Sequence, residues 1–445
     1  MLNGRARFAA SALAALATYA LLGTSALAQV KTTYVSLGSG TQGILYEPST
    51  PGDKARVALY IEHPYSSYMN FSACTQLATR GYRILCADGP FTNNANGYEG
   101  YDQMAPGIKA GITYLRGITG VSKVILMGHS MGAPMMAFYQ NIAENGVATC
   151  QTADKFLPCN ANNLRSLPKA DGLVLLDAHL GDALATLTYV DPAIVDESRP
   201  GQRYKSLDMF DPANGYDRTR NQASYLPSFK SNFLSWQAER NKRLIASAQQ
   251  MFAAINARQG DLYQDDMAFD VPGANGARLW QPDLGLLRQT KNPHTLLKAD
   301  GTTPNQILVS VRPPSGKGDA ATSFSSGALP GTVRTFLGAH AIRTFASYDQ
   351  TVNDLTGIDY ASSNTSTAWN VEGVTIPLLL ICHTGHYFCR PDEIVLEHSA
   401  STDKTMAGNE GATHGITACT NCGGDFGDTV KREYDYLDGW LAARF

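Results

Sequence analysis

The chain has 445 residues, a formal net charge of −3 and only 17% charged residues. This length can bury a large hydrophobic core and still leave room for a sizeable insertion or a second domain. The weakly acidic, scattered charge excludes the basic patch that a nucleic-acid-binding protein presents. We therefore expect no nucleic-acid partner.

Residues 1–28 have the pattern of a secretory signal peptide. Arg5 and Arg7 precede an Ala/Leu-rich stretch, and the small-residue pattern Ala-Leu-Ala stands just before Gln29. An uncleaved anchor is the alternative, because the apolar stretch is almost long enough to cross a bilayer. The cleavage pattern favours removal, which predicts a secreted or periplasmic protein with no stable membrane anchor after cleavage.

Short apolar runs then alternate with helical stretches along the chain. The predicted strands are residues 56–62, 82–86, 124–127 and 172–176, and the predicted helices between them are 71–80, 104–116 and 132–145. A fifth run, 377–381, follows only after a long gap. Alternating strands and helices predict an α/β fold with a mostly parallel central sheet flanked by helices.

The gap between the fourth and fifth strands differs in composition from the rest. Residues 181–373 combine a predicted long helix, 229–258, with loops rich in Gly, Pro, Asn and Asp and with many aromatic residues. We predict that 181–373 is an inserted cap domain, and that 29–180 and 374–445 form the core. The aromatic residues either shape a substrate pocket or form the cap's own core.

One glycine-rich segment invites a cofactor interpretation. Residues 38–43, GSGTQG, match G-x-G-x-x-G, but a dinucleotide site needs that pattern between a strand and a helix. Here extended sequence ending in Pro48 follows, which predicts a hairpin turn. No metal or organic cofactor is expected.

The eight cysteines fall into close pairs. In an exported protein an even number of cysteines suggests disulfides, and pairing between neighbours is the simplest of many connectivities. A zinc site with His383 and His386, or a redox-active Cys-x-x-Cys, is the alternative. The pairs are Cys74 and Cys86, Cys150 and Cys159, Cys382 and Cys389, and Cys419 and Cys422.

Ser130 lies in the motif G-x-S-x-G, formed by Gly128, His129, Ser130, Met131 and Gly132. After a predicted strand and before a predicted helix, this motif makes a sharp turn that exposes the serine Oγ at the helix N-terminus. The flanking glycines let neighbouring backbone pack closely. The alternative is a purely structural glycine turn.

With this motif the chain resembles the α/β-hydrolase superfamily, whose esterases and lipases share G-H-S-M-G. The resemblance implies an oxyanion hole formed by the backbone N–H of Met131 and a second donor after the third strand. Family members usually carry His-Gly at that second place, whereas this chain has His63-Pro64. Since proline has no N–H, the second donor falls to Tyr65, and His63 is taken as structural.

The resemblance also places the catalytic base after the last strand, where the chain has His414. The acid is less defined, because the usual place, after residues 378–381, offers only Asp392 and Glu393, several residues late. A minority arrangement, seen in some haloalkane dehalogenases, puts the acid after the preceding strand, where Asp177 stands. Asp177 is our assignment, and Glu393 or Asp392 is the alternative.

These residues predict a secreted serine hydrolase with a small-molecule, ester-type substrate. A lactone, thioester or amide would use the same machinery, and oligomeric state is left open. The alternative from another class is a non-catalytic ligand-binding or adhesion protein on a hydrolase scaffold.

Overall fold

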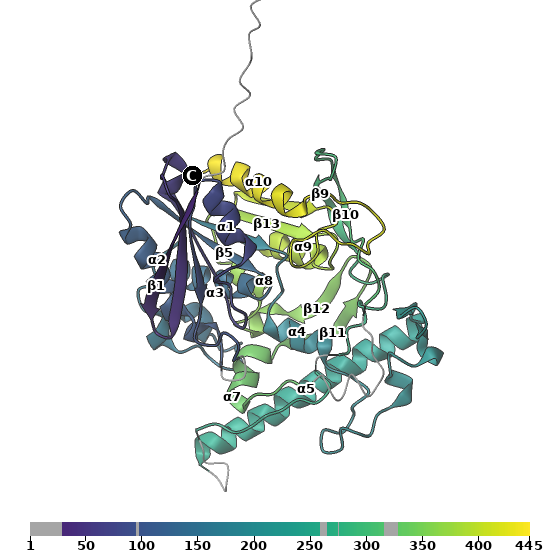
Figure 1. Cartoon of the computed structure of the whole chain (residues 1–445). Coiled ribbons are helices and arrows are strands. Elements are labelled where there is room, and N and C mark those ends of the chain that lie inside the picture. Colours follow the sequence, from purple (N-terminus) through teal and green to yellow (C-terminus); the bar gives the residue numbers. More distant parts are fainter. Residues whose placement is uncertain (1–28, 95–97, 259–264, 275, 316–327) are drawn as a thin grey trace, which may run out of the picture.

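The computed structural model describes residues 29–94, 98–258, 265–274, 276–315 and 328–445. The predicted signal peptide, residues 1–28, lies outside the described residues. At the centre is a 10-stranded sheet with the order β1-β2-β4-β3-β5-β6-β13-β14-β9-β10 (Figure 1).

Strands β3, β4, β5, β6 and β13 and helices α1, α2 and α3 match the predicted elements, and further strands and helices complete the sheet and its cover. The strands are β1 (Val30–Gly38), β2 (Thr41–Pro48), β3 (Val57–His63), β4 (Arg83–Asp88), β5 (Lys123–His129), β6 (Gly172–Leu176), β9 (Gln289–Leu297), β10 (Asn305–Val309), β13 (Leu378–His383) and β14 (Lys404–Asn409). The flanking helices are α1 (Ser72–Thr79), α2 (Ala105–Gly117), α3 (Gly132–Asn145), α8 (Thr367–Val371), α9 (Cys389–His398) and α10 (Thr429–Ala442).

The sheet is mostly parallel and is covered on both faces. Every pairing from β4 across to β9 is parallel, whereas β1–β2, β2–β4 and β9–β10 pair antiparallel. On β3, Ala58 and Tyr60 join the core beneath α2 and α3, while Leu59 and Ile61 join the core beneath α1 and α10. Burial on both faces explains why the central strands are continuous apolar runs, and it confirms the predicted α/β class.

The N-terminal hairpin accounts for the glycine-rich segment. Strands β1 and β2 pair antiparallel, with Gly38 opposite Thr41 and positive φ at Gly38 and Gly40. Residues 38–43 therefore form a turn and the start of a strand, as predicted. No helix within the described ranges is long and apolar enough to cross a membrane.

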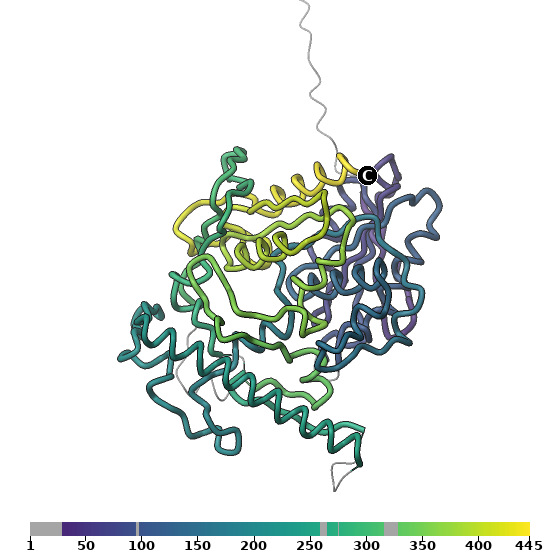
Figure 2. The backbone as a smooth tube through the Cα atoms, turned by 180° about the vertical axis from the view of Figure 1, so that it is seen from behind, coloured from purple at the N-terminus to yellow at the C-terminus, as the bar shows by residue number. Residues whose placement is uncertain are grey.

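Residues 181–373 contribute to two regions of the molecule. The helix α5 (Pro227–Ala257), close to its predicted bounds, packs on β11 (Arg343–Gln350) at the edge away from α1 and α10 (Figures 1 and 2). A small separate core joins Leu244, Val271 and Phe336. The remaining elements there are α4 (Asp182–Tyr189), β7 (Tyr216–Asp217), β8 (Gln222–Ala223), α7 (Val333–Thr335) and β12 (Leu355–Asp359).

Two strands of the same segment extend the central sheet. In β9, Thr295 to Leu297 pair parallel with Ala407 to Asn409 of β14, and β10 pairs with β9. The sequence did not indicate these strands, because residues 289–294 read QTKNPH and lack the apolar run of a buried strand. The division into a core and a cap at 181–373 stays a prediction.

All eight cysteines form disulfides between sequence neighbours: Cys74–Cys86, Cys150–Cys159, Cys382–Cys389 and Cys419–Cys422. The simplest predicted pairing is therefore confirmed, and these sulfurs are not arranged as zinc ligands. Cys382–Cys389 links the end of β13 to the start of α9 and encloses His383, the last residue of β13, and His386, in the loop that follows.

Candidate active site

Ser130 lies directly after β5, on the turn into α3. Its backbone has φ 56°, in the left-handed region that costs a non-glycine residue free energy. The Ser130 N–H donates to the Leu176 carbonyl (3.2 Å), and the Ser130 carbonyl accepts from the His179 N–H (3.1 Å). These two bonds hold the strained turn against the end of β6.

The glycines beside Ser130 are required by close backbone contacts. A Cβ at Gly128 would lie 2.5 Å from the Ala133 Cα, and one at Gly132 would lie 2.7 Å from the Glu62 carbonyl oxygen. Backbone atoms cannot move aside as a flexible side chain can. The α3 N-terminus therefore sits against β3 at a distance that only glycine permits.

Gly132→Ala is expected to lower the free energy of unfolding by about 1–3 kcal/mol, the usual cost of forcing extra volume into a packed site. Gly439→Ala is the matched control: Gly439 lies in α10 with nothing within 4 Å of its added Cβ. Alanine there should stabilise by about 0.5–1 kcal/mol. Urea unfolding of both variants tests this, and equal stabilities for the two would contradict it.

His414 and Asp177 are brought to Ser130 from two other strands of the central sheet. Asp177 follows β6 directly, and His414 follows β14. The Ser130 hydroxyl donates to His414 Nε2 (2.8 Å), and His414 Nδ1–H donates to Asp177 Oδ2 (2.5 Å). A carboxylate facing Nδ1 fixes the tautomer in which Nε2 accepts a proton.

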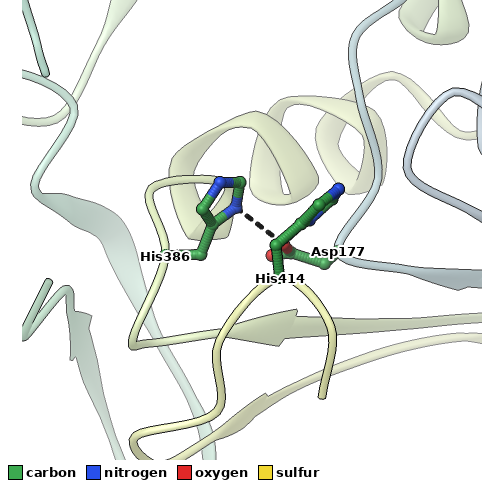
Figure 3. A group of neighbouring side chains, drawn as sticks. All are labelled: Asp177, His386 and His414. Atoms are coloured by element: carbon green, nitrogen blue, oxygen red, sulfur yellow. Dashed lines mark hydrogen bonds and ion pairs between the residues drawn. The ribbon is translucent and has the colours of Figure 1, made fainter. Parts of the chain in front are cut away.

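Asp177 is fully buried and also sits in the left-handed region, with φ 42°. Its Oδ1 accepts from the His383 N–H (3.1 Å), and His386 Nδ1 lies 2.7 Å from Oδ2. Figure 3 shows Asp177, His386 and His414 converging from three segments. The sequence did not predict that His383 and His386 contact Asp177.

Electrostatics keep Asp177 ionised in spite of its burial. Burial alone raises the pKa of Asp177, but His386, His383 and His414 outweigh it and hold the pKa well below its usual range. Burial likewise lowers the pKa of His383, but the Glu433 and Asp177 carboxylates raise it to about 9. His383 is therefore a buried cation at neutral pH, with Nε2–H donating to Glu433 (2.8 Å).

Asp392, one of the two alternative acids, is the protonated neighbour of Asp177. Burial first, and then the negative charge of Asp177, raise the pKa of Asp392 well above its usual range. Its Oδ1 accepts from the Ala178 N–H (2.8 Å). The raised pKa of Asp392 favours its protonated form, whereas the lowered pKa of Asp177 favours its ionised form.

Glu393, the other alternative acid, is committed elsewhere. It accepts from the Lys291 and Asn292 N–H groups and pairs with His294 (3.0 Å) and Arg390 (2.7 Å). Burial raises the pKa of Glu393, but His294 and the backbone donors lower it to about 2. None of these partners belongs to the hydrogen-bonded set of Ser130, so Glu393 ties β9 to α9.

The His383–Glu433 pair makes stability depend on pH. The folded pKa of His383, about 9, exceeds the unfolded value of about 6.5, so its contribution is complete below pH 6.5 and is lost as pH rises through 9. The loss is at most about 3 kcal/mol. In urea unfolding, the free energy of unfolding of the wild type should exceed that of Glu433→Gln by more at pH 6 than at pH 9. Parallel curves across this range would contradict the pairing.

Of the two predicted oxyanion donors, Met131 lines the Ser130 cavity and Tyr65 does not. Met131 lines the same cavity as Ser130 and is the N-cap residue of α3, at the helix N-terminus. Tyr65 is not in that cavity's lining, and its N–H donates to His63 Nδ1 (3.1 Å). The Ser66 N–H donates to the same His63 nitrogen (3.0 Å), which fits the structural role predicted for His63.

His129 holds the segment that carries His414. Its Nε2–H donates to the His414 carbonyl (2.7 Å), and its Nδ1 lies 2.5 Å from the Tyr68 hydroxyl. Burial first lowers the pKa of His129 well below its usual value, so the ring is neutral. His129 therefore has a structural role in the turn, through these two hydrogen bonds.

Ser130, Met131 and His414 open into a cavity of about 540 Å³. Aromatic residues Tyr387 and Phe388 and several polar groups line it. A larger hollow of about 1010 Å³ lies between α5 and β11, but neither Ser130 nor His414 lines it. Chemistry at Ser130 therefore belongs to the smaller cavity.

Asp177, His386 and His414 also have the donor atoms of a metal site. Both imidazole nitrogens already contact Asp177 Oδ2, at 2.5 Å and 2.7 Å. A zinc ion would need about 2.0–2.2 Å to each donor from a point between them. Tetrahedral ligands at this distance from zinc lie about 3.3–3.6 Å from one another. The two nitrogens are closer than that to Asp177 Oδ2, so the atoms as placed do not fit a tetrahedral zinc ion.

The mostly parallel sheet, the helices on both faces and the serine turn at a strand's carboxyl end give the chain the α/β-hydrolase fold. No protein-family model and no curated protein matches the sequence.

Solved structures that resemble the chain do so over most of its length but weakly. The siderophore hydrolase EstB from Aspergillus fumigatus has 9% identity and a TM-score of 0.43, covering 94% of this chain and 99% of that one. The hypothetical protein PA2218 from Pseudomonas aeruginosa has 12% identity and a TM-score of 0.42, covering 94% of each chain. The alpha/beta hydrolase GrgF from Penicillium sp. sh18 has 11% identity and a TM-score of 0.40, covering 93% and 99%. Likenesses this weak carry no statement about activity.

Proposed function

We propose that the chain is an exported serine hydrolase that cleaves carboxylic esters. The observation that carries the proposal is the unbroken run of hydrogen bonds from Ser130 through His414 to Asp177, opening into a cavity. Export is supported by the four disulfides, which form and persist in oxidising compartments.

The proposed mechanism proceeds through an acyl-enzyme. Ser130 Oγ attacks the ester carbonyl while His414 Nε2 takes the hydroxyl proton, and Asp177 stabilises the imidazolium that forms. The Met131 N–H stabilises the oxyanion. For Tyr65 to be the second donor, its N–H must release its hydrogen bond to His63 Nδ1 and donate to the oxyanion instead.

Collapse of the tetrahedral intermediate breaks the bond to the alcohol, which leaves with the proton from His414. Water, deprotonated by His414, then attacks the acyl group and releases the carboxylic acid and Ser130. Residues 181–373 are proposed as a cap over this site, since they include both α5 with its small core and the cavity-lining Tyr189.

The test is labelling by a fluorophosphonate, followed by peptide mass spectrometry and assays with short and medium 4-nitrophenyl esters. We expect one phosphonylated residue, Ser130, and hydrolysis that stops when it is labelled. If the folded protein is neither labelled nor active on any ester of the panel, the proposal fails. The non-catalytic binding protein then becomes the better account.

A further inference from the structure

Among the described residues, the formally charged side chains that line the Ser130 cavity are basic. Arg278 and Arg312 line it, and no Asp or Glu is part of the lining. Burial first lowers the pKa of two lining histidines, His179 to about 3 and His386 to about 4, so both are neutral at pH 7. The positive charge at neutral pH therefore comes from guanidinium groups.

Arg312 is a buried cation held by neutral groups. It is 6% exposed, and its Nη2 donates to the carbonyls of Trp280 (3.0 Å) and Leu286 (2.8 Å). Within the described ranges no carboxylate lies at ion-pair distance from it. Burial lowers the pKa of Arg312 to about 10, so the charge persists at pH 7. The negative charge of Asp283 acts on Arg312 from beyond ion-pair distance. A carboxylate in the cavity would add the close opposite charge that stabilises a buried cation.

Arg278 is positioned by an aromatic ring. Its guanidinium carbon lies 3.8 Å from the centre of the Tyr189 ring, which itself packs near Trp280. Stacking holds the planar donor fork in a fixed orientation, the arrangement that suits two-point binding of a carboxylate. Both arginines come from residues 181–373, whereas Ser130 and His414 follow the carboxyl ends of β5 and β14.

We infer that the substrate is an ester that carries a carboxylate on either its acyl or its alcohol part. Arg278 and Arg312 bind this carboxylate while Ser130 attacks the ester carbonyl. This inference rests on the proposed function and names its substrate class. Lining rings such as Tyr387 and Phe388 suit a carboxylate attached to an apolar or aromatic body.

The test compares matched substrates that differ only in charge. On the acyl side the pair is mono-4-nitrophenyl adipate and its neutral adipamate. On the alcohol side the pair is 4-acetoxybenzoate and 4-acetoxybenzamide. In at least one pair we expect kcat/KM for the carboxylate to exceed that for the amide by about tenfold or more. One hydrogen bond between charged groups is enough to give a preference of this size. The preference should decline with added salt.

Two variants distinguish binding of the carboxylate by Arg278 from an effect of the protein's overall charge. Arg278→Gln should reduce the carboxylate-to-amide ratio by about tenfold. Arg218→Gln removes an equal charge from an exposed position outside the lining and should keep the wild-type ratio. Equal turnover of acid and amide in both pairs, with Ser130 still labelled, overturns the inference and leaves the hydrolase intact. Failure of labelling and of all turnover rejects the hydrolase itself, and the inference with it.

Discussion

Ser130→Ala is expected to lower kcat/KM for 4-nitrophenyl esters by about 10⁴-fold or more, which is the usual cost of losing the nucleophile of such a triad. The effect should be this large because, among the described residues, Ser130 Oγ is the hydroxyl at hydrogen-bond distance from His414 Nε2 (2.8 Å). Ester assays on purified protein, with thermal unfolding to verify the fold, provide the measurement.

The control for this variant lies at the other end of the same strand. Ser122 immediately precedes β5 and its hydroxyl makes only a long contact with the Arg56 carbonyl (3.4 Å). Ser122→Ala should therefore retain wild-type turnover. Retained activity in Ser130→Ala would mean that another group carries the reaction, and the assignment of the nucleophile would be wrong.

Asp177→Asn should reduce kcat by about 10⁴-fold, because an amide at this position favours the wrong tautomer of His414. The amide would also leave the His383 cation without the charge it now faces. Ester kinetics from pH 6 to 9 measure the loss, and the fold is checked by circular dichroism at each pH.

Asp392→Asn is a closely matched control for this substitution. Asp392 is buried beside Asp177, but it is already neutral, so asparagine preserves both its charge and its acceptor for the Ala178 N–H. Turnover should stay within a few-fold of wild type. Glu393→Gln should instead lower stability, since Glu393 pairs with Arg390 and His294. If Glu393→Gln abolished turnover in a stable protein while Asp177→Asn did not, the acid would be Glu393.

The central strands and the serine turn could be predicted because their signals are local. The run 124–127 is apolar from end to end. The glycines of G-x-S-x-G mark places where backbone atoms approach too closely for a side chain, as the Glu62 carbonyl does at Gly132. The disulfide pairing was equally accessible, since each cysteine bonds to its nearest neighbour along the chain.

What escaped prediction depends on contacts between distant segments. Strand β9 has the polar sequence QTKNPH at its start, and it is held in the sheet by pairing with β14 and β10 and by the Glu393 carboxylate. The sequence also could not predict that burial and neighbouring charges lower the pKa of Asp177 and raise that of Asp392. The role of His383 as a buried cation requires Glu433, which lies on the last helix.

The disulfide between Cys382 and Cys389 has a practical consequence for making the protein. It encloses His383 and His386, and Cys419, from the Cys419–Cys422 pair, lines the cavity beside His414. A recombinant chain that accumulates in a reducing cytosol would hold thiols at these places. Its specific activity should then vary from batch to batch with the extent of oxidation. Expression with export to the periplasm, and purification without thiol reagents, should give a uniform preparation.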